Sequence, residues 1–252
     1  MGWQVILSGI LALFLLLLTG LPPRSMWTFA AISMALEAVY FILLSNAYSD
    51  HEFSLVYPIA RGTAPAFLML WSVLFLHEKP SLGGAFGVGM IVCGMVIIGA
   101  TSLIQSRGSK LHWRGVLVAL AVALIISLYT LIDGTAVKNG PPLPYALTMF
   151  VFVPFLTTTY NLRRYGWKQF AAAWQGPRIP LILTAILGVV AYLLALTAYT
   201  LAPLSYSGAI REVSVVIGAF LGWQFLEEKM GAQRVLGSLV IFAGILIIAI
   251  FG

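Results

Sequence analysis

The chain of 252 residues is dominated by long apolar segments, and this pattern constrains its fold more than any other feature. A helix of about 20 residues rises about 30 Å, which is the thickness of the hydrocarbon core of a bilayer. The segments occupy residues 3–20, 26–48, 54–76, 82–104, 113–137, 143–162, 178–200, 205–226 and 231–251. We therefore predict an all-α polytopic membrane protein with about nine transmembrane helices.

Composition and charge agree with a multi-pass protein of the cell (plasma or inner) membrane. Only 9% of the residues are charged and 61% are hydrophobic, whereas soluble domains hold about 25% charged residues. Most basic residues lie in short loops, which is typical of membrane proteins and argues against nucleic acid as a partner. Their distribution predicts that Met1 lies inside and Gly252 outside. Cys93 is the one cysteine, so we expect no disulfide, no thiolate metal site and no cofactor.

Two predicted helices resemble each other along their length. Arg61 lies early in the segment 54–76, and Arg211 lies in the equivalent place of the segment 205–226. The same offset relates Gly87 to Gly237, since 211 − 61 and 237 − 87 both equal 150. A constant offset over several helices indicates an internal repeat.

The repeat divides the chain into a first unit of four helices, residues 1–104, a connecting loop, residues 105–112, and a second unit of five helices, residues 113–252. The helix at 113–137 has no counterpart ahead of Met1. Corresponding helices are separated by an odd number of spans, so the units cross the membrane in opposite senses. We therefore predict two inverted repeats (4+5), the organisation of many secondary transporters.

The two arginines are candidate substrate-binding residues, because a charge within a span faces the protein interior or a cavity. Inverted repeats would place Arg61 and Arg211 on opposite sides of a central cavity, where they could attract a carboxylate or phosphate. The alternative is an internal ion pair, either Arg61 with Glu37 or Arg211 with Asp133. Tyr57, one turn before Arg61, is a further candidate for the substrate site.

Asp133, Tyr129 and Tyr192 complete the predicted substrate site. Tyr129 and Asp133 are four residues apart and share a helix face, and Tyr192 lies in the middle of its span. The alternative is that Asp133, together with Gly134, caps the end of a helix near the membrane surface.

Glu37 and Glu212 are candidates for proton coupling. A carboxyl group within a span is disfavoured in its charged form, which suits a proton carrier. The alternative for Glu37 is a hydrogen-bonded structural acid. Glu212 follows Arg211 directly, so the two side chains point about 100° apart on a helix and adjacency alone does not pair them.

The chain resembles the EamA-type branch of the drug/metabolite transporter superfamily over essentially its whole length. The resemblance is carried by residues 47–48, 54–62, 64–65 and Glu78 in the first half, and by residues 129–134, 210–212, Ser214 and Glu228 in the second. It implies a ten-helix fold of two inverted five-helix units around a central cavity that moves small metabolites. The family's first helix, which bears a His-Ala-x-x-Trp-Asn type motif, is missing here.

These observations favour a secondary active transporter that exports a small organic metabolite by alternating access, with proton coupling. The alternative from another class is a non-transporting membrane protein, either an assembly partner or an inactive truncated carrier. No H-E-x-x-H, G-x-S-x-G or P-loop motif is present in the sequence, so an enzyme is not expected. The expected partners are a small-molecule solute and the lipid bilayer, and a homodimer stays open.

Overall fold

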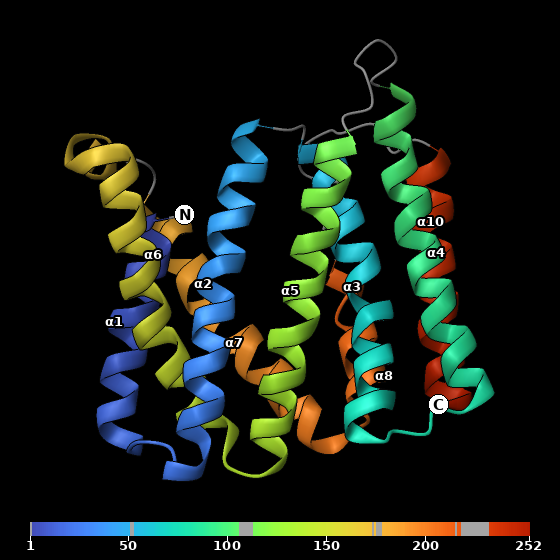
Figure 1. The fold of residues 1–252 in the computed structure, drawn as a ribbon, viewed down its shortest axis with the longest axis horizontal. Helices are drawn as coiled ribbons and strands as arrows, with labels where there is room; N and C mark the ends of the chain where they lie inside the picture. Colours follow the sequence, from blue (N-terminus) through green and yellow to red (C-terminus); the bar gives the residue numbers. More distant parts are fainter. Residues whose placement is uncertain are drawn as a thin grey trace. The chain divides into compact units, whose positions relative to one another are not determined.

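The computed structural model describes residues 2–50, 53–105, 113–172, 174, 178–214, 216–217 and 232–252, and the regular structure in these ranges is helical. The elements are α1 (Gly2–Thr19), η1 (Arg24–Met26), α2 (Trp27–Asp50), α3 (Phe53–Leu76), α4 (Leu82–Gln105), α5 (Trp113–Lys138), α6 (Pro142–Ala172), α7 (Arg178–Leu201), α8 (Leu204–Ile210) and α10 (Ala232–Phe251) (Figure 1). By length and composition, α2, α5, α6 and α7 can each cross a membrane, and shorter apolar stretches lie in α1, α3, α4 and α10. The prediction of an all-helical polytopic fold is confirmed.

Two helices differ from their predicted extents. Helix α6 continues past residue 162, but Gly166 has φ 76° and ψ 163°, so the helix that begins at Pro142 is interrupted there. The predicted helix 205–226 is interrupted at Arg211, because Glu212 N–H donates to the carbonyl of Ala209, three residues back, instead of continuing the α-helical pattern. Residues 218–231 lie outside the described part of the chain.

The chain forms two compact units, and each of them takes helices from both halves of the sequence. One unit contains Met1–Ile42 and Ile132–Leu201, and the other contains Leu43–Leu131 and Ala202–Gly252. The predicted repeats, residues 1–104 and 113–252, describe similarity along the sequence rather than compactness in space. The repeat division therefore stays a prediction.

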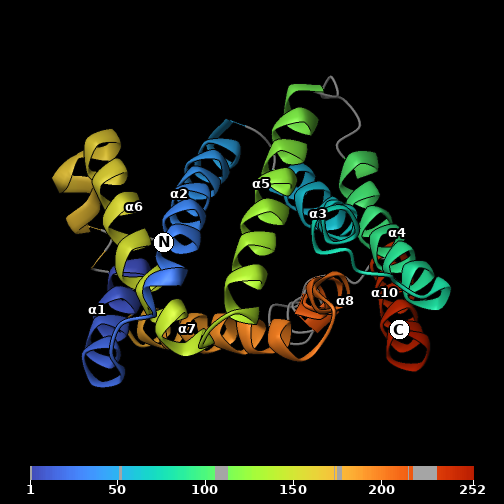
Figure 2. The ribbon, with the colours of Figure 1, turned by 60° about the horizontal axis from the view of Figure 1, so that its bottom comes forward.

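In the first unit, α1 packs against α6 and α7, and α6 also packs against α7 (Figure 2). Pro154 in α6 cannot donate a hydrogen bond to the carbonyl of Phe150, one turn earlier. Gly9 of α1 approaches that carbonyl so closely that an added methyl group would lie 3.1 Å from its oxygen. Beside this contact, Ala12 and Leu16 of α1 form a buried apolar cluster with residues of α6 and α7.

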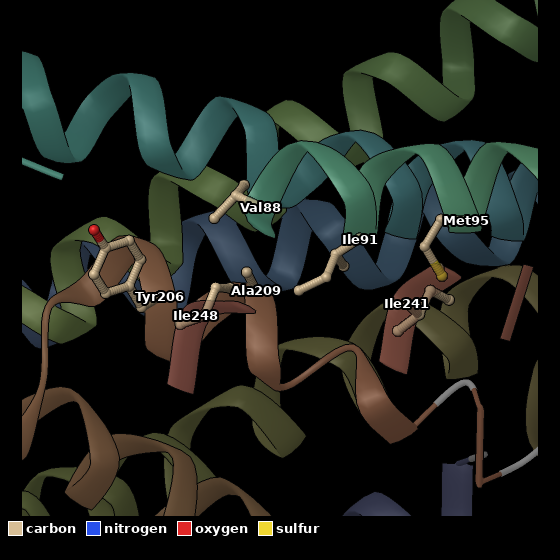
Figure 3. Packing of buried hydrophobic residues seen from close by; sticks show 7 residues of the cluster. All are labelled: Val88, Ile91, Met95, Tyr206, Ala209, Ile241 and Ile248. Atoms are coloured by element: carbon tan, nitrogen blue, oxygen red, sulfur yellow. The ribbon is translucent and has the colours of Figure 1, made fainter. Parts of the chain in front are cut away.

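In the second unit, α4 and α10 lie side by side (Figure 2). Helix α3 packs against α4 and α8, and α8 also contacts α4 and α10. The apolar cluster between them contains residues of α4, α8 and α10 (Figure 3), namely Val88, Ile91, Met95, Tyr206, Ala209, Ile241 and Ile248. Glycines make the close approach of α4 and α10 feasible, because no side chain separates the backbones. A methyl group added at Gly87 would lie 2.8 Å from the carbonyl oxygen of Gly244, and one added at Gly94 would lie 2.6 Å from that of Gly237.

These glycine contacts are reciprocal under the offset of the sequence repeat. Gly87 corresponds to Gly237 and Gly94 to Gly244, since both pairs are 150 residues apart. The contact of Gly87 with Gly244 therefore has a counterpart in the contact of Gly237 with Gly94. Such an exchange of equivalent positions is what a two-fold relation between the two helices produces.

We expect Gly94→Ala to lower the free energy of unfolding by about 1–3 kcal/mol, the usual cost of overpacking. The added methyl group would force α4 and α10 apart at the carbonyl of Gly237. Gly89→Ala is the matched control on the same helix, because nothing lies within 4 Å of a methyl group added there. Denaturant unfolding in detergent tests both variants, and equal stability of the two would contradict this packing.

Glu78, which follows α3, fixes the start of α8 in the second unit. Its carboxylate accepts the N–H of Leu204 at 2.6 Å, the N–H of Ser205 at 3.2 Å and the hydroxyl of Ser205 at 2.7 Å. These N–H groups belong to the first turn of α8, where they have no partner within the helix, and the negative charge suits a helix N-terminus. Glu78 thereby positions the helix that leads into Arg211 and Glu212.

Removal of this carboxylate by Glu78→Ala is expected to cost about 1–3 kcal/mol of unfolding free energy, because buried backbone donors lose their acceptor. Lys79→Ala, at the exposed next position, should leave stability within about 0.5 kcal/mol of the wild type. Thermal unfolding of the purified variants measures the difference. A wild-type midpoint for Glu78→Ala would show that the cap does not stabilise the unit.

Candidate functional site

Asp133 is the centre of a buried polar cluster in the first unit, formed with Ser33, Tyr145 and Tyr192 and called here the Asp133 cluster. Ser33 donates to Oδ1 at 2.5 Å and Tyr145 donates to the same oxygen at 2.8 Å. Tyr192 donates to Oδ2 at 2.8 Å. An ionised carboxylate only accepts hydrogen bonds, so three hydroxyl donors suit the charged form of Asp133.

Four helices contribute one residue each to the Asp133 cluster. Asp133 lies on α5 and is 1% exposed, and Ser33 on α2 and Tyr145 on α6 are fully buried. Tyr192 lies on the buried stripe of α7, between Val189 and Leu196, as the helical spacing of three and four residues requires. Its ring also meets that of Phe150 edge to face, with centroids 5.5 Å apart.

Glu37 and Tyr129, two other predicted residues, each share a helix with a member of this cluster. Glu37 is half-buried on α2, one turn after Ser33 and on the same face. Glu37 therefore lies on the face of α2 that carries Ser33, a member of the cluster. Tyr129 is 9% exposed and lies one turn before Asp133 on α5.

A second group of charges, called here the arginine cluster, lies in the second unit and consists of Arg61, Arg211 and Glu212. Arg61 Nη1 donates to Glu212 Oε1 at 3.2 Å, and Arg211 Nε is 3.9 Å from the same oxygen. The Glu212 side chain is 1% exposed, whereas those of Arg61 and Arg211 are 26% and 25% exposed. The acid is therefore enclosed, and both cations remain partly accessible.

The second carboxylate oxygen of Glu212, Oε2, is buried and has no hydrogen-bond partner among the described residues. A buried acceptor without a donor is costly, and in native proteins a protein group, an ordered water or a bound group usually satisfies it. Two guanidinium groups and one carboxylate also leave the arginine cluster with a net charge of +1. Chemically, a partly exposed guanidinium group can bind an anionic group, and Oε2 can accept a hydrogen bond.

The structure changes several interpretations of individual residues. The alternative role of Asp133 as a helix cap is wrong, because α5 continues to Lys138 and Asp133 is buried. Arg61 pairs with Glu212, a partner that the sequence did not suggest. The sequence suggested two alternative ion pairs, Arg61 with Glu37 and Arg211 with Asp133. The two residues of each pair belong to different compact units, so both ion pairs stay predictions. The side chain of Tyr57 lies outside the described part of the chain.

Ser33 and Tyr145 were missed by the sequence analysis, although the sequence holds a signal for each. Ser33 precedes Glu37 by one helical turn, so a polar face on α2 could have been noticed. Asp133 and Tyr145 lie at similar distances from the tight turn around Gly140 that joins α5 to α6. Antiparallel helices joined by a short turn bring such positions opposite each other.

Among the described residues, no group of three or more histidine, cysteine, aspartate and glutamate side chains could hold a metal ion.

Comparison with known proteins agrees with this picture. The chain is 24% identical over 229 residues to the uncharacterized transporter YwfM of Bacillus subtilis (strain 168), covering 88% of this chain and 73% of that protein. Its fold matches that of a protein of known crystal structure with a TM-score of 0.80 and 15% sequence identity, over 100% of this chain and 88% of the other. The model of the EamA-like transporter family matches residues 1–100 and 113–250. The chain is thus a multi-pass inner-membrane protein that belongs to the EamA-like transporter family.

Proposed function

We propose that the protein is a secondary active transporter that exports a small organic anion by alternating access. The observation that carries this proposal is the arginine cluster, in which two partly exposed guanidinium groups lie beside the buried carboxylate of Glu212, whose Oε2 has no hydrogen-bond partner among the described residues. Charged residues within membrane proteins are costly and mark the pathways of substrates and ions. A cluster of this kind is not needed to hold an apolar bundle together.

The chemistry of the arginine cluster suggests the class of solute. Guanidinium groups bind carboxylate and phosphate groups through parallel N–H donors, and Arg61 and Arg211 are the accessible members of the cluster. Oε2 of Glu212 would accept a hydrogen bond from an N–H or O–H group of the same solute. The proposed ligand therefore carries an anionic group and a donor close to it. Tyr57, beside Arg61 in sequence, stays a candidate contact.

The reciprocal glycine contacts between α4 and α10 support the proposal that the repeats are inverted. An inverted repeat lets a carrier exchange the roles of its two halves, which opens a midplane site to each side in turn. The repeats proposed here comprise residues 1–104 and 113–252, with residues 105–112 between them. Arg61 and Arg211 occupy equivalent positions in these repeats. Each arginine would therefore lie on the outer side of the binding site in one state of the carrier and on the inner side in the other.

A thermal-stability screen of the purified protein tests the proposed ligand chemistry. Small carboxylic acids and phosphates are compared with their neutral amides or esters, so that each pair differs in charge alone. A ligand present at 100 times its Kd stabilises the folded state by about 2.7 kcal/mol. We expect stabilisation by acids but not by their neutral counterparts, and we expect Arg61→Ala to remove it. Stabilisation of Arg61→Ala by the same acids would exclude this cluster as the binding site.

A further inference from the structure

An open groove of about 400 Å³ lies in the first unit between α1 and α6, which pack side by side (Figure 1). Gly9 and Pro154 line it and are both buried, and a methyl group added at Gly9 would lie 3.2 Å from Pro154 Cγ. The exposed apolar side chains of Ile10 and Phe155 line it as well. The groove is thus an apolar surface between two apolar helices that is open on one side.

The face of α6 that lines the groove ends at a basic residue. Thr159 and Leu162 belong to the lining, together with Ile6 near the start of α1. Arg163 directly follows Leu162, lies one turn after Thr159 on the same helix face, and is exposed. The helix is interrupted three residues later at Gly166. The apolar groove therefore leads to a cationic side chain at the end of the regular part of α6.

The basic residues of the first unit gather after this groove. Arg24 and Lys138 are the exceptions. The range 160–180 contains no aspartate or glutamate. It contains four basic residues, all of which are exposed, namely Arg163, Arg164, Lys168 and Arg178. The sequence predicts that basic loops such as this one face the cytoplasm, and the cytoplasmic leaflet is the one that carries anionic lipids.

Tryptophan side chains accompany these basic residues. The rings of Trp3, at the start of α1, and Trp174, ahead of α7, have centroids 4.7 Å apart. The guanidinium carbon of Arg178 lies 5.7 Å from the centroid of the Trp174 ring, a cation–π distance. Trp167, just after the interruption of α6, is 66% exposed. Tryptophan is enriched where hydrocarbon meets the lipid headgroups, so these rings indicate the level of the headgroups beside the groove.

We propose that the groove between α1 and α6 binds an acyl chain of an anionic phospholipid, whose phosphate group is bound by Arg163 and the basic residues that follow it. An apolar groove by itself does not select among lipids, because lipid tails are as apolar as its lining. Charge complementarity provides the selection, since guanidinium groups bind phosphate through parallel N–H donors. The arginine cluster belongs to the other unit, so this lipid is a bound partner and not the transported solute.

Native mass spectrometry of the purified full chain tests the headgroup preference. The protein in detergent receives equal amounts of phosphatidylglycerol and phosphatidylcholine with the same acyl chains. We expect the wild type to retain phosphatidylglycerol in preference to phosphatidylcholine. Arg163→Ala should lower this preference about fivefold, the usual contribution of one basic side chain near an anionic surface. Arg24→Ala is the matched control, because it removes an exposed arginine that follows the other end of α1, and it should keep the preference.

A second pair of variants tests the groove. Ile10→Trp places a larger side chain in the groove and should abolish retention of the lipid. Leu17→Trp is the matched control, since Leu17 lies two turns further along the same face of α1, is exposed and does not line the groove. Thermal unfolding without lipid shows whether each variant is folded. Arg163→Ala alters an exposed side chain, so it keeps the test informative if Ile10→Trp does not fold.

Four results would overturn the proposal. One is equal retention of the two lipids by the wild type, and another is a preference that falls equally in Arg163→Ala and Arg24→Ala. The third is the same lipid retention in Ile10→Trp as in Leu17→Trp. The fourth is a dimer without bound lipid that Ile10→Trp dissociates, which would assign the groove to a second copy of the chain.

Discussion

Arg61→Ala is expected to lower the free energy of unfolding by about 3–5 kcal/mol and to abolish solute binding. The loss in stability follows because Glu212, which is 1% exposed, would keep a buried negative charge without its closest cation. The loss in binding follows because the net positive charge of the arginine cluster would disappear. Denaturant unfolding and ligand-induced thermal stabilisation measure the two effects on the same preparation.

A double-mutant cycle separates the ion pair from other contributions of Arg61. Glu212→Gln removes the charge of the partner, so Arg61→Ala in that background should cost at least about 1 kcal/mol less than in the wild type. Arg163→Ala removes an exposed arginine on α6 and should leave stability within about 0.5 kcal/mol. Additive effects of Arg61→Ala and Glu212→Gln would show that the two side chains do not interact.

Asp133→Asn is expected to reduce solute transport by about tenfold or more while the protein remains folded. The amide oxygen can still accept from Ser33 and Tyr145, but the amide nitrogen would face the hydroxyl of Tyr192 as a donor. A hydrogen bond to a charged group contributes about 1.5–3 kcal/mol, which corresponds to a change of about tenfold or more. Initial rates of flux in proteoliposomes measure the loss.

Single hydroxyl deletions show whether the charge of Asp133 or its full set of donors matters. Tyr145→Phe and Tyr192→Phe each leave the carboxylate with two of its three hydroxyl donors. We expect both to transport better than Asp133→Asn, because each of them retains the carboxylate and two of these hydroxyl donors. Wild-type flux in Asp133→Asn would remove the Asp133 cluster from the mechanism.

The helical architecture could be predicted from the sequence alone, because the thickness of the membrane sets the length of each apolar segment. The repeat stays a prediction, and the contacts of Gly87 with Gly244 and of Gly94 with Gly237 are compatible with it. The family model bears out the membership that motifs around Arg61 and Asp133 had suggested. These features depend on local composition and on spacing along the chain, which a single sequence displays directly.

The sequence could not define which side chains of different helices contact each other. Arg61 and Glu212 lie 151 residues apart, and nothing in either segment distinguishes Glu212 from Glu37 as the partner. The interruption at Arg211 was missed for a related reason, because no proline or glycine occupies that position and the 3₁₀-type bond of Glu212 depends on its surroundings. Tertiary packing, rather than local helix propensity, determines which acid pairs with Arg61 and where the helix is interrupted.

Solute flux into proteoliposomes under a pH gradient tests the central claim most directly. The solute is an acid that stabilises the purified protein, and the vesicle interior is acidic, so that outward proton movement drives uptake by exchange. We predict saturable accumulation that collapses with a protonophore and is absent in Arg61→Ala. Binding of the acid without any flux in the wild type, or flux that is linear in concentration and equal in Arg61→Ala, would contradict a proton-coupled carrier that uses the arginine cluster.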